Sequence, residues 1–194
     1  MMRRVCVFCG SNPGLGDCYL NAARLLGRVL AERSVGLVYG GAKVGMMGAL
    51  ADAALAAGGE VVGVMPKGLL RLEVAHCGLT RLHEVESMHE RKALMADLAD
   101  GFIALPGGFG TLDEFCEILT WAQLGLHEKP CGLLNVDGYY DAMLAFLDHA
   151  VSQQLLKAAH RAMILDDTDP QRLLDRMAGY RPVHLEKWIS RAET

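Results

Sequence analysis

The feature of this sequence that most constrains its fold is a regular alternation of short apolar runs with longer segments of helical periodicity. Seven runs rich in β-branched or apolar residues lie at 5–9, 35–39, 60–65, 80–85, 101–105, 131–136 and 162–165. Between them, apolar residues recur at helical spacing over 19–33, 46–57, 88–98, 112–124 and 140–151. Such alternation is typical of parallel strands connected by helices that cover both faces of one sheet. The sequence therefore predicts an α/β fold with a doubly wound, mostly parallel sheet.

The length and the composition favour one domain. The chain has 194 residues, 52% of them hydrophobic, and no segment rich in Ser, Pro or charge divides it. We expect a single domain over 1–194, with a peripheral tail from about residue 180.

The charge pattern and the hydropathy argue against two classes of partner. The formal net charge is −4, with acids and bases interspersed, so the sequence has no basic stripe for nucleic acid. No apolar segment approaches the roughly 20 residues that span a bilayer. The apolar run after Arg3 and Arg4 is too short for a signal peptide. We expect a cytoplasmic protein that binds neither nucleic acid nor a membrane.

Neither the cysteines nor the histidines form a metal-binding motif. The six cysteines are scattered, without a second C-x-x-C to complete a zinc site, and the seven histidines show no H-x-x-x-H or H-E-x-x-H spacing. We expect free thiols, no disulfide and no bound metal.

Glycine-rich segments follow three of the predicted strands, at 10–16, 40–41 and 106–110. In doubly wound sheets, ligands bind beyond the carboxyl ends of the strands, so we expect these segments to converge on one pocket. A dinucleotide would require G-x-G-x-x-G after the first strand and an acid at the end of the second. The first glycines have the wrong spacing and the second strand ends in Tyr39-Gly40-Gly41, which disfavours NAD.

The segment ALPGGFGTLDEF, residues 104–115, has the composition of a phosphate-binding turn. Its glycines permit positive φ angles and leave no Cβ in the way of a ligand. Thr111 is suited to cap a helix that begins at Leu112, whose unpaired amides attract an anion. The same prediction places Asp113 and Glu114 in the first turn of that helix, where two carboxylates oppose an anionic ligand.

A second motif precedes this segment in the chain. Ser87 and Glu90 form a capping box, which predicts a helix that begins near Met88. Arg91 occupies a place within the apolar stripe of this helix. We therefore expect its guanidinium to point inward and to require an acidic partner from 106–114. A purely structural ion pair is the alternative to a catalytic one.

Glu114 also has two interpretations. In the sequence TLDE, residues 111–114, the glutamate fits a capping box and could do no more than bond back to the helix terminus. Beside a glycine-rich cradle, the same carboxylate lowers anion affinity unless it takes part in the chemistry. Arg91 and Lys92 could supply the compensating positive charge. The pattern alone does not separate these interpretations.

Together, the two motifs resemble those of a known family. MHERKALM (88–95) and PGGFGTLDE (106–114) are similar to the paired M-x-x-R-K-x-x-M and P-G-G-x-G-T-x-x-E motifs of the LOG (LONELY GUY) family. These enzymes are cytokinin riboside 5′-monophosphate phosphoribohydrolases, often mislabelled lysine decarboxylases. Matches at CGS (9–11), YGG (39–41), GMMG (45–48) and TWAQLG (120–125) extend the resemblance to about residue 140. Asn12 and Met46 depart from the family pattern, which bears on base preference.

The resemblance implies roles for individual residues. It implies that Arg91 and Glu114 are catalytic. It also implies that the substrate is held by Glu73, Lys92, Gly107, Gly108, Phe109, Gly110, Thr111, Leu112, Asp113 and Thr120, with Gly108, Gly110 and Thr111 at the 5′-phosphate. The family further implies a Rossmann-like fold and a homodimer, and we expect no cofactor.

The implied reaction is hydrolysis of the N-glycosidic bond of a purine nucleoside 5′-monophosphate, either AMP or an N6-modified form of the cytokinin type. The products are the free base and ribose 5-phosphate. The rival interpretation is a non-catalytic carrier of a nucleotide or of the molybdenum cofactor, which needs no Arg91 with Glu114 at its pocket. A lysine decarboxylase usually requires pyridoxal phosphate on a lysine, and the sequence shows no recognisable lysine site for it.

Overall fold

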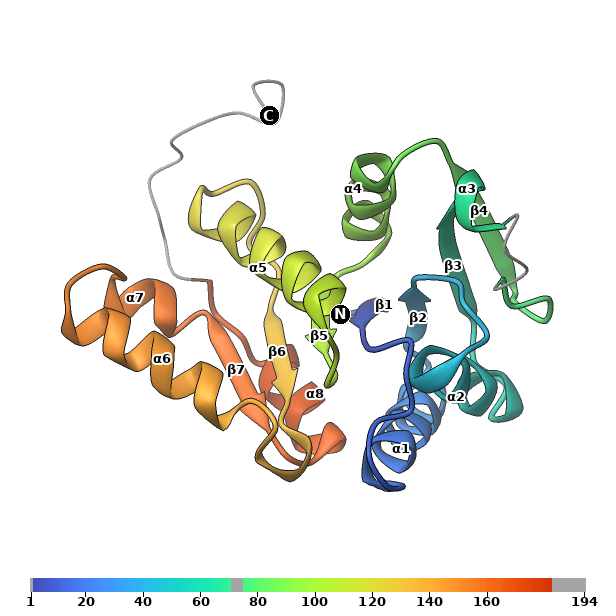
Figure 1. The fold of residues 1–194 in the computed structure, drawn as a ribbon, viewed down its shortest axis with the longest axis horizontal. Helices are drawn as coiled ribbons and strands as arrows, with labels where there is room; N and C mark the ends of the chain where they lie inside the picture. Colours follow the sequence, from blue (N-terminus) through green and yellow to red (C-terminus); the bar gives the residue numbers. More distant parts are fainter. Residues whose placement is uncertain (1, 71–74, 183–194) are drawn as a thin grey trace.

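The computed structural model describes residues 2–70 and 75–182. Its centre is a seven-stranded sheet with the order β4-β3-β2-β1-β5-β6-β7 (Figure 1). Every neighbouring pair is parallel. The strands are β1 (Arg4–Phe8), β2 (Gly36–Tyr39), β3 (Val61–Pro66), β4 (Arg81–Val85), β5 (Gly101–Ala104), β6 (Cys131–Leu134) and β7 (Ile164–Asp167). The predicted α/β class, a doubly wound Rossmann-like sheet, is confirmed.

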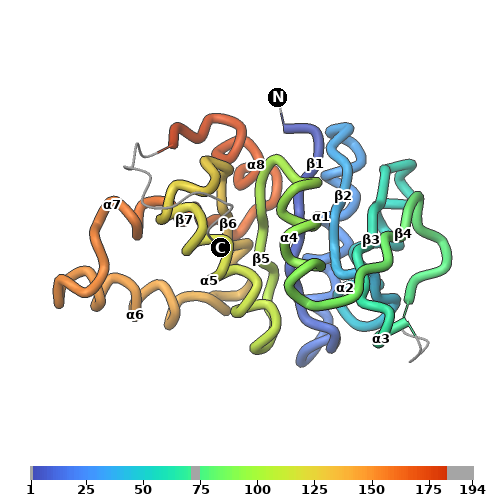
Figure 2. Tube along the Cα trace, turned by 90° about the horizontal axis from the view of Figure 1, so that it is seen from above, coloured from blue at the N-terminus to red at the C-terminus, as the bar shows by residue number. Residues whose placement is uncertain are grey.

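Helices cover both faces of this sheet (Figure 2). Helices α1, α2 and α8 contribute to the apolar core on one face, and α4, α5 and α6 contribute to the core on the other. The helices are α1 (Cys18–Glu32), α2 (Gly45–Ala56), α3 (Lys67–Leu70), α4 (Met88–Leu98), α5 (Phe109–Gln123), the 3₁₀ helix η1 (Val136–Gly138), α6 (Asp141–Ser152), α7 (Ala158–Arg161) and α8 (Pro170–Ala178).

The five inner strands, β3, β2, β1, β5 and β6, are almost entirely apolar because both of their faces are buried, whereas the edge strands β4 and β7 carry partly exposed polar residues. In β1, Val5 and Val7 belong to the core under α1 and α2, whereas Cys6 and Phe8 belong to the core under α4 and α5. A strand that faces two cores has no polar face, so it shows a continuous apolar run in the sequence. This is why composition alone predicts the inner strands.

The strand order reverses at β1. From β1 the sheet grows outward through β2 and β3 to β4, and then from β5 in the opposite direction to β7. The exits of β1 and β5 therefore border the crevice in which ligands of doubly wound sheets bind. A hydrogen bond from Gly10 N to Pro106 O, 3.1 Å long, joins these two exits.

The seven predicted strands are confirmed, with ends that differ from the prediction by at most two residues. The helix predicted over 88–98 has those ends in the structure. The helix predicted to begin at Leu112 begins instead at Phe109, so its N-terminal boundary was wrong. The short elements α3, η1 and α7 and the longer α8 were not predicted.

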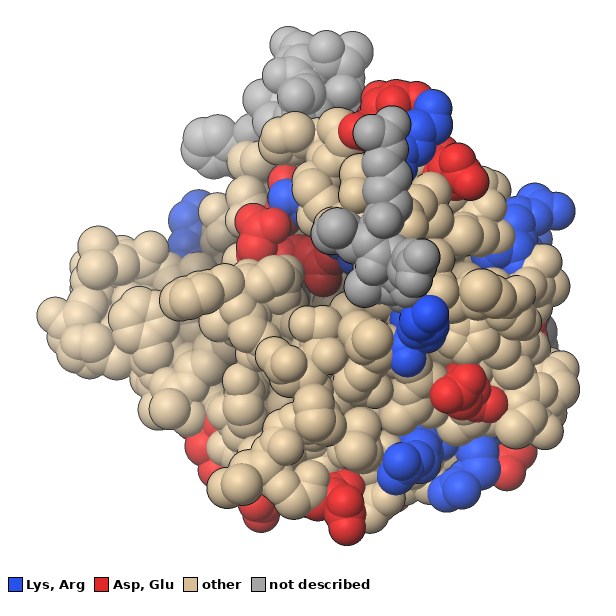
Figure 3. Space-filling model, turned by 45° about the vertical axis from the view of Figure 1, so that its right-hand side comes forward, with Lys and Arg blue, Asp and Glu red and all other residues tan. Residues whose placement is uncertain are grey.

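The surface and the cysteines agree with the predictions from composition. Acidic and basic side chains are interspersed over the face seen in Figure 3. Among the described residues, no helix combines the length and the hydropathy needed to cross a bilayer. All six cysteines are free thiols, as predicted.

The close crossing of α1 and α2 gives a test of the fold. A Cβ at Gly27 would overlap the carbonyl oxygen of Leu50 and lie 3.2 Å from the Cβ of Ala53. We expect Gly27→Ala to lower the free energy of unfolding by about 1–3 kcal/mol, because backbone overlap outweighs the better helix propensity of alanine. Urea titration measures this. Arg28→Ala, at the next and exposed position of α1, is the control; a Gly27→Ala protein as stable as the parent would contradict the crossing.

Candidate active site

A cavity of about 870 Å³ lies beyond the carboxyl ends of β1, β2 and β5. The glycine-rich exits of these three strands all contribute to its wall, which confirms that they converge on one pocket. Other wall residues come from α2, β3, α4 and α5. Those at the three exits are Cys9, Gly10, Ser11, Asn12, Gly14, Gly40, Ala42, Pro106, Gly107, Gly108, Phe109, Gly110 and Thr111.

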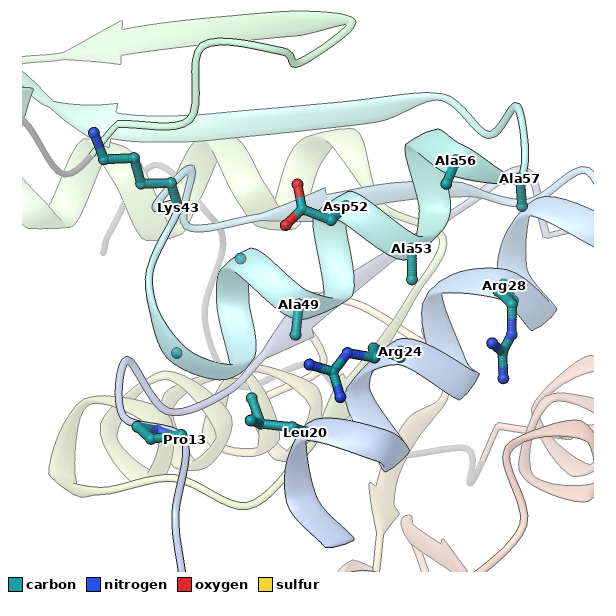
Figure 4. Close-up of a pocket in the computed structure, with 12 residues that line it drawn as sticks. Pro13, Leu20, Arg24, Arg28, Lys43, Ala49, Asp52, Ala53, Ala56 and Ala57 are labelled. Carbon is teal, nitrogen blue, oxygen red and sulfur yellow. The ribbon is translucent and has the colours of Figure 1, made fainter. Parts of the chain in front are cut away.

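A second cavity of about 680 Å³ lies between α1 and α2 (Figure 4). Arg24 and Arg28 from α1 and Lys43 and Asp52 from the α2 side line it. It reaches the segments after β1 and β2 only through Pro13, Lys43 and Gly45. Asp52, the one acid among its described lining residues, is paired with His76 Nε2 at 2.9 Å. Its charged side chains are exposed. The first cavity is the candidate site because it holds a buried acid and a buried base.

Arg91 and Glu114 form a buried ion pair at the first cavity. Arg91 Nη1 lies 2.6 Å from Glu114 Oε1, and the two side chains are only 10% and 9% exposed. Arg91 Nε also donates to the carbonyl oxygen of Val64 in β3, at 3.1 Å. A Cβ at Gly40 would overlap Arg91 Nη2, so a larger residue at this position would displace the guanidinium. The prediction that Arg91 points inward to an acid of 106–114 is confirmed.

The start of α4 positions Arg91. Ser87 Oγ accepts a hydrogen bond from Glu90 N at 3.1 Å, and Glu90 Oε2 accepts one from Glu86 N at 2.8 Å. The predicted cap is therefore present, although the glutamate bonds to residue 86 rather than to residue 87. Because the first turn of α4 is fixed on both sides, the residue that follows it has a defined direction.

The environment of Glu114 changes its basicity. Burial raises the pKa of the Glu114 carboxyl above its usual value, and the neighbouring Arg91 opposes this rise through its charge and its hydrogen bond. Within the described part of the chain, Oε2 of Glu114 has no hydrogen-bond partner. One oxygen is thus held by the guanidinium, and the other is available as a base stronger than an exposed carboxylate.

The N-terminus of α5 forms another part of the wall. Gly108 is the N-cap residue, so Thr111 is not the cap and Glu114 does not cap the helix. For the amides of residues 108–111 no acceptor is found within the described ranges. These amides, together with the helix dipole, favour an anion at this end of the cavity.

The boundary of α5 removes the charge conflict expected from the sequence. The first turn of α5 contains no acidic residue. Asp113 and Glu114 instead follow in the second turn, which separates their charges from the free amides. The expectation that both acids lie in the first turn was wrong because the helix begins three residues earlier than predicted.

The glycines of the turn have a different role from the one expected. Gly107, Gly108 and Gly110 are absent from the residues with positive φ, so they are not required for a left-handed backbone. A Cβ at Gly107 would overlap Thr111 Oγ1, whereas a Cβ at Gly108 or Gly110 would meet no atom within 4 Å. Gly107 thus permits close packing, and the other two leave open space at the cavity.

Several residues implied by the resemblance lie outside this cavity wall. Lys92 Nζ is 3.1 Å from Asp113 Oδ2 and 2.9 Å from Glu117 Oε2, in a charged cluster between α4 and α5. Thr120 Oγ1 donates to Cys116 O within α5, and Leu112 packs at the edge of the core. Lys92 therefore does not supply charge at the cavity wall, and Arg91 is the basic side chain that lines it among the described residues. Glu73 lies outside the described residues.

Tyr139 is a wall residue that the sequence analysis missed. It follows η1, and its hydroxyl donates to the carbonyl oxygen of Gly107 at 2.7 Å. The turn sequence NVDG, residues 135–138, after β6 was the available signal, because glycine and asparagine mark a chain reversal at a strand exit. The pattern could not show which strand exit the tyrosine would reach.

The chain matches known proteins over most of its length. Residues 47–177 match a family model described as "Possible lysine decarboxylase". The cytokinin riboside 5′-monophosphate phosphoribohydrolase of Rhodococcoides fascians is 52% identical over 164 residues, which cover 84% of this chain and 83% of that protein. A cytokinin riboside 5′-monophosphate phosphoribohydrolase of Arabidopsis thaliana is 46% identical over 182 residues, 94% of this chain and 80% of that protein.

Solved structures show the same fold at lower identity. The molybdenum cofactor binding protein from Rippkaea orientalis superposes with a TM-score of 0.68 at 21% identity, over 92% of this chain and 97% of that one. This likeness bears on the fold alone. The family is shown by the sequence relatives: the chain belongs to the LOG family of cytokinin riboside 5′-monophosphate phosphoribohydrolases.

Proposed function

We propose that this protein hydrolyses the N-glycosidic bond of purine nucleoside 5′-monophosphates, AMP or its N6-modified cytokinin-type forms, and releases the free base and ribose 5-phosphate. The observation that carries the proposal is the buried Arg91–Glu114 pair on the wall of a cavity that also contains the free amides of α5. The names of relatives that are 46% and 52% identical support it.

The 5′-phosphate binds at the N-terminus of α5. The free amides of residues 108–111 and the hydroxyl of Thr111 are the donors at this end. Thr111 is 3% exposed and lies on the cavity wall. A bound phosphate would satisfy these donors with charge-assisted hydrogen bonds. The binding energy of the phosphate then places the ribose against the ion pair.

Glu114 is the group that acts on the ribose. As the base departs, C1′ becomes positive, in a transition state like the oxocarbenium ion of glycoside hydrolysis. The carboxylate stabilises that charge and takes the proton of the attacking water, which its raised pKa favours. Water's oxygen forms the new bond to C1′, and the electrons of the N-glycosidic bond leave with the base. Glu114 then gives up the proton to solvent, and the departing base takes up a proton, so the free base is neutral and the carboxylate is restored. Arg91 holds Glu114 ionised and in place.

The two rival functions fit the cavity less well. A non-catalytic carrier of a nucleotide or of the molybdenum cofactor gains nothing from a buried acid–base pair, which costs desolvation energy. A lysine decarboxylase needs a lysine for pyridoxal phosphate, and no described lysine lines this cavity.

Further properties follow from the family and the composition. We place the protein in the cytoplasm as a homodimer. The contacts with substrate that the resemblance implies for Lys92, Leu112, Asp113 and Thr120, which the structure puts outside the cavity wall, and for Glu73, which lies outside the described residues, stay predictions.

Glu114→Gln tests the catalytic role of the ion pair. We expect kcat with AMP to fall by about two or more orders of magnitude, because the amide keeps the shape and loses the charge that stabilises C1′. Release of adenine, followed by chromatography, measures this. Glu117→Gln is the matched control, since Glu117 lies one turn further along α5 and pairs with Lys92. Near-normal turnover in Glu114→Gln would leave the pair a structural one.

The contribution of the 5′-phosphate to catalysis is tested by comparing kcat/KM for AMP with that for adenosine. Several charge-assisted hydrogen bonds are lost with the phosphate, so we expect a net loss of about 3–5 kcal/mol, or roughly two to four orders of magnitude in kcat/KM. Thr111→Val should weaken the reaction with AMP and leave the residual reaction with adenosine almost unchanged. Equal efficiency on both substrates would favour a plain nucleosidase.

Exhaustive EDTA treatment tests the chemistry of the site. No group of three or more His, Cys, Asp or Glu side chains suited to a metal ion occurs in the described ranges. The mechanism above uses a carboxylate and water alone, so we expect activity to survive the treatment. Loss of activity with rescue by one divalent ion would show that a metal takes part.

A further inference from the structure

Two consecutive tyrosines hold the turn between β5 and α5. Tyr140 Oη donates to the carbonyl oxygen of Leu105 at 2.7 Å, and Tyr139 Oη donates to that of Gly107 at 2.7 Å. The carbonyl between them, that of Pro106, accepts from Gly10 N at 3.1 Å. Three successive carbonyls of the turn are thus bound from outside it.

The bond from Tyr139 fixes the direction of an amide. In a trans peptide, the carbonyl of one residue and the N–H of the next point in opposite directions. All described peptide bonds are trans. Because the Gly107 carbonyl points to Tyr139, the N–H of Gly108 points away from it. This amide belongs to the N-cap residue of α5, lies at the cavity and has no acceptor within the described ranges.

Without the hydrogen bond from Tyr139, only packing contacts would hold the Gly107 carbonyl in place. Added Cβ atoms show how close that packing is: one at Gly10 would lie 3.3 Å from Gly107 Cα, and one at Gly107 would overlap Thr111 Oγ1. Packing limits where the residue lies. The orientation of its peptide plane, however, depends on a directional bond, because glycine has no side chain that restricts its φ and ψ.

The segment that carries Tyr139 is itself held by hydrogen bonds and ring packing. Asn135 Oδ1 accepts from Tyr140 N at 2.8 Å, and Asn135 Nδ2 donates to Asp141 Oδ1 at 2.7 Å. Asp137, with φ of 51°, adopts the left-handed region that only a few per cent of non-glycine residues occupy. Such a conformation persists when its surroundings impose it. The ring of Tyr139 also packs edge-on against that of Tyr140, with centroids 5.1 Å apart.

We propose that Tyr139 is a positioning residue for the phosphate end of the site. By holding the Gly107 carbonyl, its hydroxyl keeps the Gly108 amide directed to the 5′-phosphate of the substrate, without acting on the reacting bond. This inference rests on the proposed function, since it assigns the anion at α5 to a nucleotide phosphate.

Tyr139→Phe tests the inference because it removes the hydroxyl and keeps the ring. The loss of one hydrogen bond that orders a phosphate donor should lower kcat/KM for AMP by roughly three- to tenfold, mainly through KM. The value for adenosine should not change. Ribose 5-phosphate, titrated by calorimetry, should bind more weakly by a similar factor.

Tyr140→Phe is the matched control. It removes the same kind of bond from the same turn, but the peptide that Tyr140 fixes leads to Pro106, which has no N–H to present. We expect lower thermal stability, because a buried carbonyl loses its donor, and an unchanged ratio of kcat/KM between AMP and adenosine.

The outcomes separate this inference from the proposed function. A loss confined to AMP and ribose 5-phosphate in Tyr139→Phe supports the positioning role. Equal losses on AMP and adenosine, an unchanged value for AMP, or the same AMP-specific loss in Tyr140→Phe would overturn it. If the parent protein releases no base from AMP, the proposed function fails. In that case the dissociation constants of AMP and adenosine are measured for the parent and Tyr139→Phe proteins. Weaker binding of AMP with unchanged binding of adenosine would support the positioning role, and any other result would overturn it.

Discussion

The buried ion pair between Arg91 and Glu114 is the constraint on which the rest of the site depends. Two charges withdrawn from water persist only when they are paired and hydrogen-bonded. Arg91 meets this requirement through Glu114 and the carbonyl of Val64. The pair can form only where α4 and α5 approach each other above the strand exits, and only beside Gly40, where a Cβ would overlap the guanidinium. The sheet, its helices and one glycine therefore fix the position of the carboxylate.

In α5, the amides that can bind an anion and the carboxylate of Glu114 lie in different turns of the helix. The first turn of α5 contains no acid and presents free amides to an anion, and the second turn carries the acid proposed to face the sugar. Since a helix turn rises about 5.4 Å, phosphate and carboxylate need not compete for the same place. The remaining charges, Lys92 with Asp113 and Glu117, join α4 to α5 outside the cavity. They hold together the two helices that carry the Arg91–Glu114 pair.

Much of the fold was predictable, and the failures have identifiable causes. The five inner strands are buried on both faces, so each gives an apolar run that composition reveals, whereas β4 and β7 at the edges of the sheet carry partly exposed polar residues. Helix α8 was missed although Asp169 caps it and Pro170 occupies its first turn, because the apolar positions 173, 174 and 177 were too few to give a clear period. The start of α5 was misplaced because Thr111 resembles a cap. The glycines before Thr111 are poor helix formers, so the sequence does not suggest that the helix includes them. The helix nevertheless begins at Phe109, where close packing between Gly107 and Thr111 places its first turn.

The class of fold, the pocket at the strand exits, the inward direction of Arg91 and the family could all be inferred from the amino-acid sequence. These depend on periodicity and on local motifs, which act over a few residues. The tertiary structure alone decided that Glu114 pairs with Arg91 rather than capping a helix, that Lys92 lies outside the cavity, and that Tyr139 reaches Gly107. Gly107 and Tyr139 are 32 positions apart in the sequence, and they meet because β5 and β6, which precede them, are neighbours in the sheet. A local pattern carries no information on such distances, since packing of the whole sheet sets them.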